Sequence, residues 1–253
     1  HMKKLILSLA LCCAATTFFA QEATDPAKLI NEGKAALEAK NYQEAYTKFS
    51  TYLTQTNNQD SVIAYNCGVC ADKIKKPAEA VKYFDIAVQK KYNLANAYIG
   101  KAGALKDLKK NDEYVATLKE GLEAVPGNKT LTKLYSNYYI NAGITAQKAG
   151  KVEEAEEAYK QVLAFQGNNV NALYSLGALY FNNGATILKK ATPLATSDRA
   201  KYDEEAAKAD KDFKEAKTYL EKLVPLLSAD KPAQKKMLDN ANNLLKQVAE
   251  QLK

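Results

Sequence analysis

A spaced set of a small residue, an alanine and an aromatic residue recurs along the chain and constrains its fold more than any other feature. Gly33, Ala45 and Phe49 are followed at the same spacing by Gly68, Ala80 and Phe84. A small residue and an alanine let two helices approach closely, and the aromatic ring fills the space beyond them. The spacing therefore predicts helical hairpins of about 34 residues, which must stack on one another to bury their apolar faces.

Five units of this kind can be placed between residues 26 and 228. They span residues 26–59, 61–94, 95–128, 129–169 and 170–228. The third unit carries Tyr114 where the second helix of the others has alanine. The fourth begins with seven extra residues, 129–135. Since Leu131, Leu134 and Tyr138 continue one apolar helical stripe through them, we expect a longer first helix rather than a loop.

The fifth unit is interrupted at its hairpin turn by 27 extra residues, 185–211. Pro193 should break the first helix of this unit, and Ser197 should cap a second helix that runs to about Val224. At a rise of 1.5 Å per residue, the second helix would be on the order of 40 Å long, with its tip clear of the other hairpins. Residues 230–253 should form an amphipathic helix that caps the open end of the stack.

These units resemble the tetratricopeptide repeat (TPR) family across nearly the whole mature chain. The long fifth hairpin resembles that of exported envelope proteins of the same type. The resemblance implies an all-α fold: an α-α superhelix of about five TPR helix pairs with a C-terminal capping helix, formed by residues 21–253 as a single domain. It also implies that the first helix of each pair lines a concave groove, in which such scaffolds bind other proteins.

Residues 1–20 have the layout of a secretory signal. Two lysines precede an apolar run from Leu5 to Ala15, and small and aromatic residues lead to Ala20. A lipoprotein signal would instead acylate Cys12 or Cys13, but the residues before them are bulkier than the small residue that such signals require. We expect export to the periplasm with cleavage after Ala20. The apolar run is too short for a transmembrane span.

Composition and charge disfavour an enzyme or a nucleic-acid-binding protein. The formal net charge of +7 falls to +5 without the two signal lysines, and basic and acidic residues are interleaved along the mature chain. His1 precedes Met2 and is expected to be a cloning remnant, which leaves no histidine for catalysis. Carboxylate runs such as Asp203-Glu204-Glu205 lie beside lysines, as on a solvated helix face. We expect no enzymatic activity, cofactor or metal.

Cys67 and Cys70 form the one motif that suggests chemistry. A Cys-x-x-Cys pair can serve thiol redox reactions or bind zinc. Both cysteines fall at packing positions of the second unit, and a zinc site would need two further ligands that the mature chain lacks. We therefore interpret them as buried hydrophobic residues, although an oxidising envelope could link them. A thiol-disulfide factor of the envelope stays open as an alternative function.

The candidate partner-binding residues follow from the family resemblance, which places them on the groove side of the first helices. They are asparagines and tyrosines: Asn31, Tyr65, Asn66, Asn96, Asn137, Asn141, Asn171 and Tyr174. An amide both donates and accepts hydrogen bonds, so a ladder of amides can pair with the main chain of an extended peptide. The same amides could instead bind their own neighbours or water, and both interpretations stay open.

The function expected from these features is a protein-protein interaction scaffold of the cell envelope that holds a polypeptide segment in its groove. The basic clamp by which some cytosolic relatives grip a carboxylate tail is missing, because only Lys34 is in place. A glycan- or peptidoglycan-associated module is a further alternative. It is supported by the 16 tyrosines but not by tryptophan, which the chain lacks.

Overall fold

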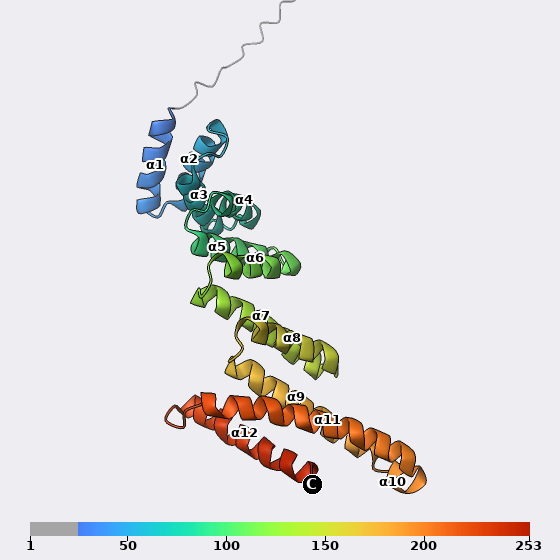
Figure 1. The fold of residues 1–253 in the computed structure, drawn as a ribbon. Helices are drawn as coiled ribbons and strands as arrows, with labels where there is room; N and C mark the ends of the chain where they lie inside the picture. The colour runs from blue at the N-terminus through green and yellow to red at the C-terminus, as the bar shows by residue number, and fades with distance from the viewer. Residues whose placement is uncertain (1–24) are drawn as a thin grey trace, which may run out of the picture.

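The computed structural model describes residues 25–253, in which every regular element is a helix (Figure 1). The expected signal segment, residues 1–20, lies outside the described residues. The helices are α1 (Pro26–Glu38), α2 (Tyr42–Gln55), α3 (Ser61–Lys73), α4 (Pro77–Gln89), α5 (Leu94–Asp107), α6 (Asn111–Ala124), α7 (Lys129–Lys148), α8 (Val152–Phe165), α9 (Val170–Ala191), α10 (Leu194–Ser197), α11 (Arg199–Leu223) and α12 (Pro232–Gln251), with a 3-10 turn η1 (Val224–Leu226).

The helices pack in chain order as an open stack of pairs. Helices α1–α2, α3–α4, α5–α6, α7–α8 and α9–α11 form units 1 to 5, and α12 packs against α11 at the end. Figure 1 shows α1 and α12 at opposite ends of the stack. The predicted all-α superhelix of about five helix pairs with a C-terminal capping helix is thereby confirmed.

Each pair is closed by contact between a small residue of its first helix and a large side chain of its second. A Cβ atom at Gly33 would lie 2.5 Å from the Phe49 ring, and one at Gly143 would lie 2.4 Å from the Tyr159 ring. Equivalent contacts join Gly68 to Phe84 and Gly177 to Leu220. The absence of a side chain at these glycines therefore sets how closely the two helices approach.

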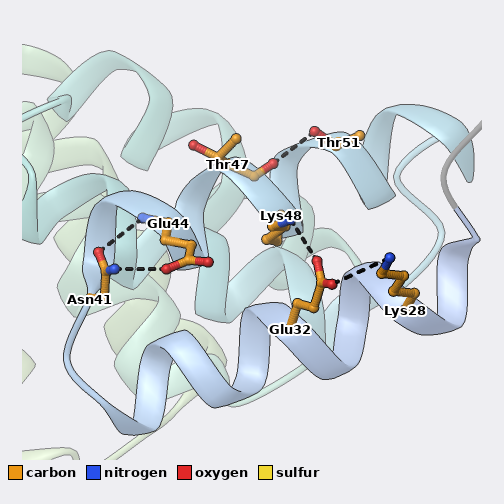
Figure 2. Close-up of polar contacts among 7 residues, drawn as sticks. All are labelled: Lys28, Glu32, Asn41, Glu44, Thr47, Lys48 and Thr51. Carbon is orange, nitrogen blue, oxygen red and sulfur yellow. Dashed lines mark hydrogen bonds and ion pairs between the residues drawn. The ribbon is translucent and has the colours of Figure 1, made fainter. Parts of the chain in front are cut away.

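The first hairpin shows how a turn between helices is fixed by polar contacts (Figure 2). Asn41 caps α2: its Oδ1 accepts a hydrogen bond from the Glu44 N–H at 3.3 Å, and its Nδ2 donates to the Glu44 carboxylate at 2.8 Å. Lys48 of α2 donates to Glu32 of α1 at 2.5 Å, and Lys28 lies 3.8 Å from the same carboxylate. Such solvent-accessible pairs contribute little to stability, so most of the stability comes from the buried contacts.

Helix α7 belongs to two hydrophobic cores. Leu131 and Tyr135, in its first two turns, are buried among residues of α5 and α6. Ala146, near its other end, packs with Tyr159 and with residues of α9 and α11. The seven extra residues of unit 4 thus form two turns of one continuous 20-residue helix, as expected from their apolar stripe. These turns attach unit 4 to unit 3.

The 27 extra residues of unit 5 lengthen both of its helices, which form a hairpin that extends past the others (Figure 1). Helix α9 ends just before Thr192 and Pro193, where the break was expected. The expected cap was wrong by one residue. Asp198 caps α11, its Oδ1 accepting from the Lys201 N–H at 3.1 Å, whereas the Ser197 hydroxyl donates back to the Pro193 carbonyl oxygen within α10.

Candidate functional site

The eight predicted groove residues all lie on the first helices of their units, and three of them line the two depressions of largest volume described here. Asn137 and Asn141 on α7 and Asn171 on α9 border two large depressions on either side of α7. The other five, Asn31, Tyr65, Asn66, Asn96 and Tyr174, lie outside these depressions. The structure therefore concentrates the candidate site at units 3 to 5.

Three of these five residues have contacts of their own within the fold. The Asn96 side chain donates to the Asn93 Oδ1 at 3.0 Å, next to the start of α5. The Tyr65 ring packs edge-on against the rings of Phe84 and Tyr92, each at 5.8 Å. Tyr174 packs against the apolar cluster between α9, α11 and α12. Asn96 therefore makes a local contact at the start of its own helix, whereas Tyr65 and Tyr174 help to pack the repeats.

The first depression, here called the amide hollow, has a volume of about 700 Å³. It lies where the start of α7 meets the linker between α8 and α9. Its lining consists of Leu122, Pro126, Gly127, Lys129, Thr132, Lys133, Ser136, Asn137, Phe165, Gln166, Asn169 and Asn171. Amides and lysines dominate this lining, and it contains no carboxylate.

A hydrogen-bonded group fixes one wall of the amide hollow. The Gln166 Oε1 accepts from the Ser136 hydroxyl at 2.7 Å and from the Asn169 side chain at 3.0 Å. This arrangement holds the linker against α7 and leaves the side chains of Asn137 and Asn171 exposed. Phe165 stands beside them with 40% of its surface exposed, its ring 4.8 Å from that of Tyr135.

The second depression, the hairpin-turn hollow, has a volume of about 650 Å³ and lies between units 3 and 4. Lys106, Asn111 and Tyr114 form its unit 3 side, while Asn137, Asn141 and other α7 residues form the unit 4 side. A third depression of about 480 Å³, the glutamate hollow, adjoins it on α7 and α8. All three hollows surround α7.

The two extra turns of α7 explain why the hollows gather around this helix. Leu131 and Tyr135 bind the start of α7 to unit 3, so the rest of the α7–α8 hairpin is set away from α5 and α6. Sequence reasoning found the insertion but missed Phe165 and Gln166 as groove residues. Both sit at the end of α8, where the repeat pattern indicates only a linker. The seven-residue insertion was the available signal that this junction differs from the others.

Tyr114 also belongs to this junction. It replaces the alanine of the other units, is buried, and its ring lies 5.7 Å from that of Tyr138 on α7. Burial raises the pKa of its hydroxyl. The large side chain therefore spans from unit 3 to unit 4 and forms part of the floor of the hairpin-turn hollow.

Cys67 and Cys70 are free thiols with no exposed surface. Burial raises the pKa of Cys67, and it raises the pKa of Cys70 to about 11. A redox thiol needs the opposite, an accessible sulfur with a lowered pKa. The pair therefore packs as small hydrophobic residues between units 1 and 2, which argues against a thiol-disulfide function.

Two further observations limit the chemistry of the described part of the chain. Between residues 25 and 253, no group of three or more histidine, cysteine, aspartate or glutamate side chains is placed to hold a metal ion. Over the same residues, none of the helices combines the length and the apolarity needed to cross a membrane.

Comparisons with known proteins agree with this architecture. Residues 148–184 match the TPR repeat family. No curated protein matches the chain. A TPR repeats protein from Bacteroides fragilis, solved by crystallography, is 56% identical over 87% of this chain and 99% of its own, with a TM-score of 0.80.

Weaker structural matches include MamA, 17% identical over 78% of this chain and 92% of its own (TM-score 0.38). Another is a TPR protein of Thermus thermophilus, 17% identical over 87% of this chain and 98% of its own (TM-score 0.35). The identity and coverage of the Bacteroides fragilis match decide the assignment: this chain belongs to the tetratricopeptide repeat family.

Proposed function

We propose that this protein is an exported, non-enzymatic scaffold that binds an extended segment of a partner protein in its concave groove, chiefly at the amide hollow. TPR proteins are generally non-catalytic scaffolds that bind protein partners. The observation that carries the finer proposal is the exposure of Asn137 and Asn171 in the same hollow as an exposed aromatic ring, Phe165.

The chemistry of the amide hollow suits a polypeptide main chain. Asn137 and Asn171 each offer a donor and an acceptor, which can pair with peptide groups without selecting a side chain. Phe165 offers an apolar surface for one side chain of the segment. Lys129 and Lys133 give the hollow a positive charge, so we expect segments with an acidic residue to bind more tightly than segments with a basic one.

A controlled binding experiment tests the proposal. Short random peptides displayed on phage are selected against the chain without its signal, and the affinity of a selected peptide is measured by titration calorimetry. The double variant Asn137→Ala, Asn171→Ala should weaken binding roughly thirtyfold, because it removes two hydrogen bonds worth about 1 kcal/mol each. The matched control is Asn242→Ala, Asn243→Ala, which removes two exposed asparagines from α12.

Equal affinities of the two double variants would refute the amide hollow as the binding site. Phe165→Ala provides a second check and should also weaken binding, while Phe165→Leu, which keeps an apolar side chain against the Tyr135 ring, controls for the lost packing. Circular dichroism verifies that every variant keeps its helix content.

The proposed export is tested separately. The native gene is expressed in its own cell type, and the protein is isolated from envelope and cytoplasmic fractions for N-terminal mass analysis. We expect a mature chain that begins at Gln21 in the envelope fraction. A lipid-modified Cys12 or Cys13 at the N-terminus, or an uncleaved cytoplasmic protein, would contradict this proposal.

A further inference from the structure

One face of unit 4 is only partly covered, by contacts such as that of Tyr138 with Tyr114, where the same face of units 2 and 5 is buried. The difference is seen at the residue that precedes the glycine in contact with the second helix of each unit. This residue is Cys67 in α3, Leu176 in α9 and Ala142 in α7. Cys67 and Leu176 have no exposed surface, because each packs into the core that it shares with the preceding unit. Ala142 is exposed. The α7–α8 pair therefore exposes part of a surface that, in units 2 and 5, packs against the preceding unit.

The glutamate hollow lies on this face. Tyr138, Tyr139 and Ala142 of α7 form one wall, and Glu153, Glu154, Glu157 and Ala158 of α8 form the other. The rings of Tyr138 and Tyr139 meet edge to face, with centroids 5.3 Å apart. The hollow shares no lining residue with the amide hollow. It adjoins the hairpin-turn hollow, with which it shares Tyr138, Ala142 and Glu154, but it is separate from the amide hollow, where the proposed function places its main contacts.

The charges around the hollow specify what can cover it. Its lining holds three carboxylates and no cation. Glu154 pairs with Lys151 at 2.9 Å, but among the described residues no lysine or arginine forms an ion pair with Glu153 or Glu157. Glu157 instead accepts a hydrogen bond from the Gln161 side chain at 2.7 Å. An occupant with an uncharged or acidic surface would remove water from Glu153 and Glu157 without offering these carboxylates a cation.

We propose that this face docks a basic segment of a partner protein, which inserts an arginine or lysine side chain between the two tyrosines and the glutamates. The tyrosine faces attract a cation, and the carboxylates neutralise it. Arginine suits the site better than lysine, because its flat guanidinium group stacks on aromatic rings and binds carboxylates with two parallel hydrogen bonds. The volume of about 480 Å³ accommodates such a side chain together with its neighbours on the segment.

Matched peptides test the proposal on the chain without its signal. The probe is a short peptide that alternates leucine with arginine, and its twin carries citrulline, an uncharged isostere, in place of arginine. Both are titrated into the ¹⁵N-labelled protein and followed by NMR. We expect the arginine peptide to bind about tenfold more tightly than its twin, and to shift the amide signals of Tyr138, Ala142 and Glu157.

Two charge-matched double variants locate the interaction. Glu153→Gln, Glu157→Gln should weaken binding of the arginine peptide about tenfold. Glu38→Gln, Glu250→Gln removes the same charge from exposed positions on α1 and α12 and should leave the affinity unchanged. Asn137→Ala, Asn171→Ala should also leave the affinity for the arginine peptide unchanged. A failure of this docking proposal can therefore be distinguished from a failure of the proposed function.

A further variant, paired with a control, fills the hollow and leaves its carboxylates in place. Ala142→Arg places a cation in the hollow from an exposed position and should abolish binding. Gly103→Arg is the control, because no atom lies within 4 Å of a Cβ at that position on α5. Equal affinity for the arginine and citrulline peptides, or signal shifts confined to other helices, would overturn the proposal. So would concentration-dependent self-association that shifts the same amide signals without peptide, because a second copy of the chain would then be the occupant.

Discussion

Gly177 lies against the side chain of Leu220, and a Cβ at Gly177 would come within 2.6 Å of it. The two residues are 43 positions apart, whereas the equivalent pairs Gly33–Phe49 and Gly143–Tyr159 are 16 positions apart. Unit 5 therefore keeps the same packing contact as the other units, although 27 extra residues separate the two residues that make it. The insertion lengthens the hairpin away from this contact and leaves the contact itself unchanged.

The first prediction concerns this closing contact. Gly143→Ala should destabilise the protein by about 1 to 3 kcal/mol, because the new methyl group would overlap the Tyr159 ring. Gly103→Ala should instead stabilise it by about 0.5 to 1 kcal/mol, because Gly103 lies in an exposed part of α5 with open space around it. Urea unfolding followed by circular dichroism measures both. Stabilisation by Gly143→Ala as well would show that helix propensity, rather than close approach, governs Gly143.

The second prediction concerns the start of α11. Asp198→Ala should cost about 1 kcal/mol, because the Asp198 carboxylate accepts from the Lys201 N–H at the first turn. Ser197→Ala should have a much smaller effect, since its hydroxyl only donates to the Pro193 carbonyl oxygen. Thermal unfolding compares the two variants. A larger loss from Ser197→Ala would restore the cap that the sequence indicated.

These two cases show what sequence patterns determine and what they leave open. The glycine-to-aromatic spacing predicts the hairpins because each contact is local and repeats at fixed offsets. The stripe through Leu131 and Leu134 likewise identifies α7 as a long helix. The cap of α11 was misplaced by one residue because serine and aspartate are both good caps. Only the position of each side chain relative to the first-turn N–H groups decides between them.

The binding residues were harder to predict than the fold for a physical reason. Position in the repeat indicates which residues of a first helix face the groove, but a hollow arises from how neighbouring units are displaced. Asn96 and Asn137 hold equivalent positions, yet Asn96 bonds to Asn93 while Asn137 borders two hollows. Phe165 is exposed next to Gln166, whose side chain is bonded to Ser136 of α7. No periodic pattern in the sequence contains this information.

The third prediction concerns access to the cysteines. Since Cys67 and Cys70 are fully buried and their pKa values are raised, a thiol reagent should label neither rapidly at neutral pH in the native protein. Both should react at once in denaturant. Rapid labelling of the native protein at neutral pH, or two thiols that stay unreactive after unfolding because they are disulfide-linked, would revive the redox alternative.

The fourth prediction follows from the same burial and concerns alkaline pH. The pKa of Cys70 is about 11 in the folded protein against a reference value of 9.0. Between these values the unfolded chain releases the thiol proton while the folded chain retains it, so the free energy of unfolding falls as pH rises from about 9 to 11.

Cys70→Ala removes this thiol and should make the fall in the free energy of unfolding less steep. Tyrosines with raised pKa values, such as Tyr46 at about 12, should keep part of the slope in the variant. Urea unfolding of both proteins at pH 8 to 11 measures the difference, and parallel curves would mean that Cys70 retains access to water in the folded state.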